Sequence, residues 1–268
     1  PVPRREKWVL LVSTLFGCPV GCTMCDAGGN YSGKPDSTQL LQQIDFLVRR
    51  RFPQGRIPCN QFKIQFARMG EPALNDAVLD VLEKLPDRYD APGLMPSLST
   101  VAPVASSTFL KRMISIKERL YNKGNFQFQF SIHTTDKELR EKLVPIKTLS
   151  FQEMADIGNA FYRPGDRKVT LNFALAANQP VDPEILVSHF NPEVFLLKLT
   201  PLNPTYRAQQ FGLESAIDPH LPGSEETLVT RLKDAGYDVI LSIGNTEENL
   251  IGSNCGQFLR THLEESAK

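Results

Sequence analysis

The feature that most constrains the fold of this chain is a regular alternation of strand-like and helix-like segments. Apolar or period-two runs occupy residues 7–16, 62–69, 94–101, 126–133, 168–175, 194–202 and 237–243. Helical periodicity occupies residues 37–48, 75–85, 106–121, 136–143, 151–161, 183–190 and 224–235. Strands that alternate with helices form parallel sheets with right-handed crossovers. For 268 residues, we therefore predict an α/β fold, a partial (β/α)6 TIM-like barrel of parallel strands.

Local signals refine this prediction. Ser37 and Thr38 are expected to cap the first helix, and its apolar face is expected to comprise Leu40, Leu41, Ile44, Phe46, Leu47 and Val48. Pro96 weakens the strand candidate at 94–101, because proline cannot donate to a sheet. The Pro-rich stretch 191–222 is interpreted as loops within one domain. We expect a single domain over residues 1–268, ending in a short extension from about residue 245 that carries Cys255.

The overall charge excludes a global electrostatic field for nucleic acid, because 30 basic residues balance 30 acidic ones. No apolar run reaches the roughly 18 residues that a membrane-spanning helix needs, so no membrane contact is expected. The basic N-terminus precedes only a short apolar run without a cleavage site, so no signal peptide is predicted. The chain does not begin with Met, and we expect either trimming or a preceding segment.

Three of the five cysteines lie within eight residues, as Cys18, Cys22 and Cys25 in FGCPVGCTMCDAGG. This C-x-x-x-C-x-x-C group does not resemble a disulfide framework and favours a metal site in a reducing compartment. A structural zinc site usually has four protein ligands, and a chance group of buried cysteines is the simplest alternative. Three ligands leave one metal position open, as a catalytic iron–sulfur cluster requires.

Other polar loops follow the predicted strands, at the end where parallel sheets carry their active sites. RMGEP at 68–72 presents Glu71, which could accept hydrogen bonds from a ligand ammonium, and Gly70, where the backbone can approach a ligand closely. LST at 98–100 and SIH at 131–133 supply hydroxyl and imidazole groups, and PLNP at 201–204 supplies Asn203. Taken alone, such residues are usually turn and capping groups.

The cysteine spacing, its place after the first strand and the barrel pattern together resemble the radical S-adenosylmethionine (radical SAM) superfamily. The resemblance implies that Cys18, Cys22 and Cys25 hold three irons of a [4Fe–4S] cluster, whose fourth iron binds S-adenosylmethionine. One electron from the cluster then cleaves this cofactor to a 5′-deoxyadenosyl radical. The superfamily usually has an aromatic residue before the last cysteine; here Met24 stands there, and its thioether can contact adenine.

A closer resemblance is to the RlmN/Cfr class of radical SAM methylases, which methylate an adenine of ribosomal RNA. It rests on GCPVGCTMC, MGEPALN, LST, SIHTTDKELREKLVPI, TPLNP and NCGQF, spread over nearly the whole chain. The resemblance implies that the S-adenosylmethionine contacts come from Gly70, Glu71, Ser99, Ser131, Ile132, His133 and Asn203.

Two cysteines carry the methyl chemistry of that class, and this chain matches only one. Cys255, in NCGQF, corresponds to the cysteine that is methylated and passes its carbon to the base. The resolving cysteine of the class lies seven residues before the first cluster ligand, where this chain has Leu11. The N-terminal RNA-handling domain of the class has no counterpart in the sequence. Cys59 is the one spare cysteine and is expected to be structural.

We therefore favour a radical SAM enzyme that functionalises a C–H bond of a small or non-ribosomal substrate. Methyl or methylene transfer through Cys255 is one outcome, and rearrangement or another C–H functionalisation is the other. The alternatives are an RNA adenine C-methyltransferase of the RlmN/Cfr type, and a non-enzymatic iron–sulfur or zinc protein. The chemistry implies an electron donor such as flavodoxin or ferredoxin. An exposed, oxygen-sensitive cluster implies a cytoplasmic location.

Overall fold

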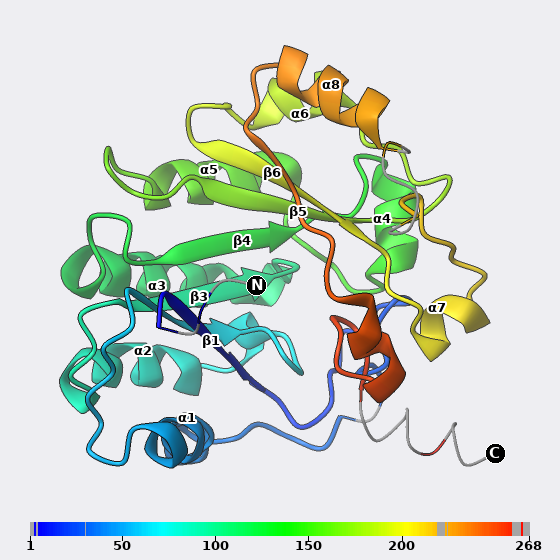
Figure 1. Ribbon diagram of the computed structural model, residues 1–268. Helices are drawn as coiled ribbons and strands as arrows, with labels where there is room; N and C mark the ends of the chain where they lie inside the picture. Colours follow the sequence, from blue (N-terminus) through cyan, green and yellow to red (C-terminus); the bar gives the residue numbers. More distant parts are fainter. Residues whose placement is uncertain are drawn as a thin grey trace.

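The computed structural model describes residues 3, 5–29, 31–218, 223, 225–258 and 264. In this part of the chain, seven strands form one sheet in sequence order, and every neighbouring pair is parallel. The strands are β1 (Lys7–Val12), β2 (Gln61–Phe66), β3 (Leu94–Thr100), β4 (Gln127–Ser131), β5 (Val169–Leu175), β6 (Phe195–Pro201) and β7 (Val239–Leu241). The predicted partial barrel of parallel strands is confirmed, with a short seventh strand at its open edge (Figure 1).

Helices connect the strands. The α-helices are α1 (Ser37–Arg51), α2 (Ala77–Arg88), α3 (Ser107–Leu120), α4 (Lys137–Leu143), α5 (Phe151–Phe161), α6 (Pro183–His189), α7 (Tyr206–Gln210) and α8 (Glu226–Asp234). Three 3₁₀ turns complete the described elements: η1 (Pro72–Leu74), η2 (Val104–Ser106) and η3 (Thr246–Ile251). No helix in the described ranges has both the length and the apolar character needed to cross a membrane.

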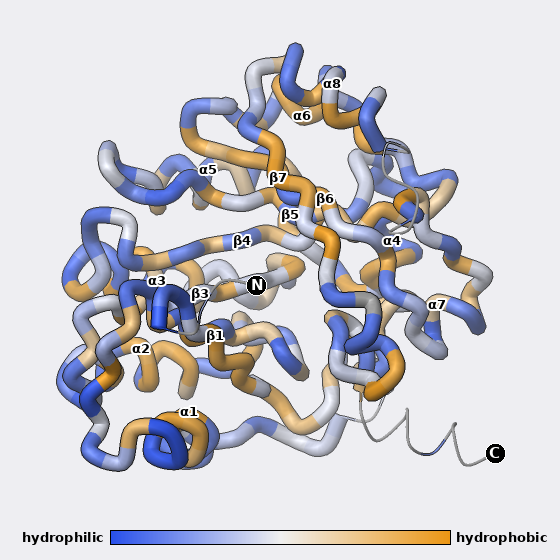
Figure 2. Tube along the Cα trace, in the orientation of Figure 1, coloured by the Kyte–Doolittle hydropathy of each residue, from blue (hydrophilic) through white to orange (hydrophobic). Residues whose placement is uncertain are grey.

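The two faces of the sheet differ in chemistry because strand side chains alternate. One face carries fully buried residues that pack on the helices, among them Phe62, Ile64, Phe128, Phe130 and Leu197. This apolar layer is visible along the strands and the inner sides of the helices in Figure 2. The residues between them, such as Lys63, Gln65, Gln129 and Lys198, are half-buried on the opposite, concave face. The helices therefore cover one face and leave the other for a ligand.

Several local predictions need correction. Helix α1 is capped by Asp36, whose side chain accepts from the Gln39 N–H, rather than by Ser37 or Thr38. Phe46 of the predicted apolar face is 64% exposed and does not pack in the core. Helix α7 lies inside the stretch that we interpreted as loops, and its side chains prove important for the site.

Pro96 lies inside β3 without breaking the sheet. It pairs with Ile64 of β2, while pairing of β3 with β4 begins only at Ser97. The missing N–H of Pro96 therefore falls where β3 has one partner, which is where a strand tolerates proline.

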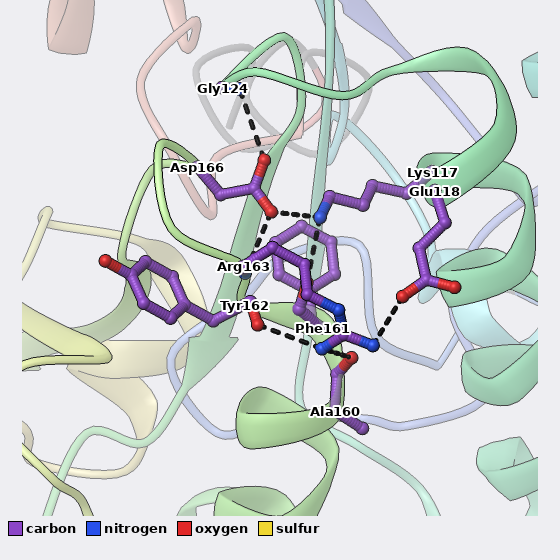
Figure 3. Close-up of polar contacts among 8 residues, drawn as sticks. All are labelled: Lys117, Glu118, Gly124, Ala160, Phe161, Tyr162, Arg163 and Asp166. Atoms are coloured by element: carbon purple, nitrogen blue, oxygen red, sulfur yellow. Dashed lines mark hydrogen bonds and ion pairs between the residues drawn. The ribbon is translucent and has the colours of Figure 1, made fainter.

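A buried ion pair fixes the end of the sheet where β4 and β5 begin (Figure 3). Lys117 of α3 pairs with Asp166, and their side chains are only 2% and 4% exposed. The ammonium also donates to the carbonyl of Phe161 at 2.9 Å. The Asp166 carboxylate accepts from the backbone N–H groups of Gly124 at 3.2 Å and Arg163 at 3.0 Å. The pair is thus fully hydrogen-bonded and joins α3, α5 and two strand-entry loops, far in sequence from the three cysteines.

Candidate active site

The three-cysteine loop leaves the end of β1 and folds into a compact turn. The Cys25 N–H donates to the Cys22 carbonyl at 3.2 Å, and the Gly28 N–H donates to the Cys25 carbonyl at 3.1 Å. A Cβ on Gly28 would lie 2.9 Å from the Gly21 Cα, so only glycine allows this close crossing of the backbone. Apolar contacts of the loop with the ends of neighbouring strands and with α4 involve Val20, Met24, Val101, Leu143, Val144 and Leu202.

Helix α7 anchors the other side of this loop. Asp26, one residue after Cys25, accepts from the backbone N–H groups of Tyr206 at 3.3 Å and Arg207 at 2.9 Å, at the start of α7. The Arg207 guanidinium returns two hydrogen bonds, to the carbonyls of Cys22 at 3.1 Å and Gly21 at 3.0 Å. The loop is therefore held in place by groups outside the thiols, which leaves the thiols themselves for a ligand.

The segment around Cys255 docks directly on the cysteine loop. The Asp26 N–H donates to the Gly256 carbonyl at 2.7 Å, and the Asn203 amide donates to the Cys255 carbonyl at 2.9 Å. Arg68, at the end of β2, donates to the carbonyls of Ser253 at 2.9 Å and Asn254 at 3.2 Å. Residues some 230 positions apart in sequence thus meet, and Cys255 is exposed beside the cysteine loop.

The thiols lie close enough to influence one another. The pKa of Cys25 is raised to about 12, mainly by burial and also by the nearby Cys255 and Cys18. Burial likewise raises the pKa of Cys22, with further contributions from Cys25 and Cys18, and burial raises the pKa of Cys18. Thiols in this state bind a soft metal by giving up their protons.

The donor set of this loop is three thiols, which suit a soft metal or an iron–sulfur cluster. No group of three or more Cys, His, Asp or Glu side chains within the described residues is arranged to hold one metal ion. The fit of the loop to a cluster therefore rests on the type and spacing of its thiols, and the cluster itself stays a prediction.

Glu71 is 5% exposed and organises the loop after β2. One carboxylate oxygen accepts from the Thr100 hydroxyl at 2.5 Å and from the Ala73 N–H at 3.0 Å, and the other accepts from the Val101 N–H at 2.9 Å. Its side chain therefore joins the ends of β2 and β3, and any ligand ammonium would be an additional partner. Gly70 has a φ of +94°, and a Cβ there would lie 2.5 Å from the Leu15 side chain. Glycine is thus required where this loop packs behind the cysteine loop.

Ser99 on β3 and Ser131, the last residue of β4, lie at the same end of the sheet, and Ile132 and His133 follow directly after β4. The Ser99 hydroxyl accepts from Gln129 at 2.7 Å. The pKa of His133 is lowered to about 3, by burial and then by Arg140, so its imidazole is neutral at ordinary pH. Nδ1 of His133 accepts from the Ala174 N–H at 3.2 Å, which leaves Nε2 as the protonated nitrogen. The φ of +70° at His133 marks a strained backbone of the kind common at functional sites.

Arg140 is a site residue that the sequence analysis missed. It is 5% exposed on α4, and its guanidinium donates to the carbonyls of Val101 at 3.1 Å and Ser131 at 3.4 Å. Nε is buried and has no hydrogen-bond partner. The guanidinium lies close enough to Cys22 for the two charges to interact. An unpartnered buried donor beside a cysteine loop suits an anionic cluster.

The structure also locates Leu11, at the position of the resolving thiol, and Cys59, the spare cysteine. Leu11 is 46% exposed on β1, opposite Gln65 of β2, on the concave face. Cys59 is 4% exposed in the main apolar core, as expected for a structural residue. All five cysteines are described, and Cys25 is close enough to Cys255 for that thiol to raise its pKa. Cys59, buried in the core, is not placed to resolve an adduct on Cys255.

The predicted site residues therefore gather at one end of the sheet. The structure brings together Cys18, Cys22, Cys25, Met24, Gly70, Glu71, Ser99, Ser131, Ile132, His133, Asn203 and Cys255 at the carboxyl ends of the strands and in the loops that follow. Their roles toward a cluster and a cofactor stay predictions.

The chain is similar to known proteins in sequence and in fold. No family model matches the chain. The probable dual-specificity RNA methyltransferase RlmN of Synechococcus sp. (strain RCC307) is 24% identical over 265 residues, which cover 97% of this chain and 71% of that protein.

Two solved structures share the fold. A radical SAM methyltransferase from Sphaerobacter thermophilus superposes with a TM-score of 0.69 at 21% identity, covering 93% of this chain and 69% of that one. Streptococcus suis SuiB bound to S-adenosylmethionine gives a TM-score of 0.59 at 12% identity, covering 90% of this chain and 51% of that one. At these identities the structures establish the fold alone.

The fold is thus the one seen in the radical SAM methyltransferase from Sphaerobacter thermophilus and in SuiB. In sequence, the chain resembles the RlmN type of methyltransferase. The resemblance inferred from the sequence, and with it the prediction of an enzyme of this kind, is confirmed.

Proposed function

We propose that this chain is a radical SAM enzyme in which Cys18, Cys22 and Cys25 hold a [4Fe–4S] cluster, and in which the cluster's remaining iron binds S-adenosylmethionine. The observation that carries the proposal is the docking of the Cys255 loop on the cysteine loop through the Asp26 N–H and the Gly256 carbonyl, 2.7 Å apart. This contact brings the three-cysteine loop next to the exposed Cys255 thiol. When bound, the cluster supplies the single electron that splits S-adenosylmethionine into methionine and a 5′-deoxyadenosyl radical.

The residues of this chain would bind and orient the cofactor. Glu71 fixes the loop that carries Gly70 through its bonds to Thr100 and Val101, so the backbone there is preorganised for the cofactor's amino acid end. The neutral His133 would offer its Nε2 proton to a carboxylate or ribose oxygen. Met24 is 7% exposed in the apolar layer beneath the loop, where its thioether suits the adenine face.

We favour a small or non-ribosomal substrate, and the observation that supports this is Leu11. Its apolar side chain lies on the concave face at the place of a resolving thiol, and Cys59 is shut in the core on the other side of the sheet. Cys255 would then act as a methyl carrier, as a hydrogen-atom donor to a substrate radical, or as a covalent anchor. Each of these uses needs a free thiol beside the cysteine loop, where Cys255 lies.

An RNA adenine C-methyltransferase of the RlmN/Cfr type is the second candidate. The name of the Synechococcus relative, aligned over 97% of this chain, favours it. It would require another group to release an adduct from Cys255 and a further surface to hold RNA. Either reading includes an external one-electron donor such as flavodoxin or ferredoxin. Both fit a cytoplasmic location, where thiols remain reduced.

The primary test is anaerobic reconstitution with iron and sulfide, reduction, and addition of S-adenosylmethionine. We expect 5′-deoxyadenosine and methionine to form in equal amounts. Cys18→Ala, Cys22→Ala and Cys25→Ala should each abolish the product, while Cys59→Ala is the matched control because that thiol lies in the core. Product formation by the three loop variants, or none by the reconstituted parent, would refute the proposal.

Mass spectrometry of the peptide that contains Cys255 then separates the outcomes. A methyl group on this thiol after incubation with S-adenosylmethionine supports methyl transfer. Product formation with an unmodified thiol points to hydrogen-atom donation or rearrangement. Salt-dependent binding of an adenine-containing RNA hairpin would favour the RNA alternative, and its absence would remove that alternative.

A further inference from the structure

Alongside apolar residues such as Leu11, the strands present polar but no acidic side chains to the concave face. None of the seven described strands contains Asp or Glu. Between the apolar residues that pack on the helices, the strands present amides, hydroxyls and lysines to this face, including Gln65, Ser97, Gln129, Asn172 and Lys198. A face of this kind can accept a polar ligand but gives its lysines no carboxylate partner from the sheet.

Lys63 of β2 and Lys198 of β6 both lie on this face, and the charge of Lys198 is close enough to lower the pKa of Lys63. Lys63 precedes Ile64, and Lys198 lies between Leu197 and Leu199; these apolar residues are fully buried against the helices. Both lysines are half-buried, and neither belongs to any ion pair among the described residues. Two partly desolvated like charges cost free energy unless an anion joins them.

The electrostatics agree with this geometry. The pKa of Lys63 is lowered to about 8, first by burial and then by Lys198, Lys7 and Arg167. Burial also lowers the pKa of Lys198, whereas the nearby Cys255 thiol raises it. Lys198 is therefore close enough to Cys255 for the two groups to interact. Lys63 also interacts with Lys7 at the start of β1 and with Arg167 just before β5.

We propose that Lys63 and Lys198 form an anion site on the concave face, which binds a carboxylate or phosphate group of the small substrate. The inference rests on the proposed function, since it assigns to that same site the class of molecule on which the enzyme acts. Gln65, Gln129 and Asn172 surround the lysines with uncharged donors and acceptors that suit the rest of a polar molecule. The substrate's reacting carbon then lies above the anion, towards Cys255 and the cysteine loop.

A small anion suits the site better than a nucleic acid backbone does. RNA binding draws on many phosphate contacts spread over an extended basic surface, but this chain has a formal net charge of zero. Two interacting lysines on one face of the sheet match a single carboxylate or phosphate. Such charge-assisted hydrogen bonds are stronger than neutral ones.

The test measures anion binding to the reconstituted full chain, without S-adenosylmethionine or reductant, by isothermal titration calorimetry at fixed ionic strength. The probes are sulfate, a tetrahedral dianion that does not titrate, and malonate, a dicarboxylate. Lys63→Gln and Lys198→Gln remove one charge each, and Lys63→Arg keeps it. The matched control is Lys111→Gln, on the exposed side of α3. Because no cofactor cleavage is involved, this experiment can fail while 5′-deoxyadenosine formation succeeds, and the reverse.

We expect saturable binding that weakens about tenfold in Lys63→Gln and in Lys198→Gln, the loss of one charge-assisted hydrogen bond. Lys63→Arg should restore most of it, and Lys111→Gln should bind as the parent does. Tighter binding of sulfate than of malonate would assign a phosphate group, and the reverse order a carboxylate. Absence of saturable binding, or binding unaffected by both glutamine variants, would overturn the proposal. Single-stranded RNA that binds far more tightly than either probe, and loses affinity in the same two variants, would also overturn it.

Discussion

Substitution of Gly256 by alanine isolates the contact that joins the two distant parts of the site. Gly256 has a φ of +82°, a left-handed conformation that costs alanine about 1–2 kcal/mol. A Cβ there would lie 2.9 Å from the Met24 carbonyl oxygen and 3.2 Å from the Thr205 methyl group. The loop must therefore shift and lose the hydrogen bond from the Asp26 N–H, a further cost of about 1 kcal/mol. We expect undocking of the Cys255 loop to become about 2–3 kcal/mol more favourable.

Hydrogen exchange of the Asp26 amide measures this directly. A change of about 2–3 kcal/mol predicts roughly 30- to 150-fold faster exchange of this amide, with little change at amides of the central strands. Gly212→Ala is the matched control, because its φ of +63° carries a similar backbone strain while a Cβ there meets no atom within 4 Å. Equal Asp26 exchange in Gly256→Ala, in Gly212→Ala and in the parent would refute the docking argument.

Three other expectations concern stability and charge. Lys117→Met leaves the buried Asp166 carboxylate without its cation and should reduce the free energy of unfolding, measured by urea denaturation, by about 3–5 kcal/mol. Arg163→Ala removes the ion pair with Glu118, whose side chains are 54% and 42% exposed. This second variant should reduce the free energy of unfolding by less than about 1 kcal/mol. A similar loss in both variants would contradict this contrast. The pKa of His133 is about 3 in the folded protein, so as the pH falls the imidazole is protonated in the unfolded chain before it is protonated in the folded one. The contribution of the neutral His133 to the free energy of unfolding is therefore complete above about pH 6.5 and falls by up to about 1.4 kcal/mol per pH unit below it. His133→Asn should flatten this slope, and an unchanged slope would argue against a buried neutral imidazole. The pKa of Lys63 is about 8, with Lys198, Lys7 and Arg167 as its charged neighbours. Because Lys63 loses its charge as the pH rises through 8, the affinity for sulfate should fall there. An affinity that does not depend on pH would exclude Lys63 as a ligand of the anion.

Much of the fold follows from the sequence because strand and helix periods are local properties. The alternation FQFQFS at residues 126–131 and the continuous run near 195–201 both become strands at the expected places. Helix α5 begins at Phe151 and ends at Phe161, as its periodicity predicts. The exposed Phe46 shows the limit of this reasoning, since a period identifies a face but does not show whether a neighbour covers all of it.

The cysteine loop could be predicted for a different reason. Three thiols at a fixed short spacing have few uses in proteins, so their spacing alone predicts an iron–sulfur site, which stays a prediction. Asn203 and Cys255 also lie where expected, and their mutual contact through the Cys255 carbonyl is the new element.

The supports of the site could not be predicted. Arg140 and Arg207 act through hydrogen bonds to backbone carbonyls of residues far away in the chain, and no local pattern encodes such contacts. Helix α7 has only five residues, too few for periodicity to stand out in a Pro-rich stretch. The meeting of Lys63 with Lys198 depends on how far the sheet curls, which strand patterns do not specify.

The central claim is that three cysteines hold a cluster with one iron open to S-adenosylmethionine. The most direct measurement is the electron paramagnetic resonance spectrum of the reduced, reconstituted protein before and after addition of this cofactor. We predict a reduced-cluster signal that changes on addition of S-adenosylmethionine in the parent and in Cys59→Ala, and that is lost in Cys22→Ala. A signal that does not respond to the cofactor, or one that persists without Cys22, would contradict the account.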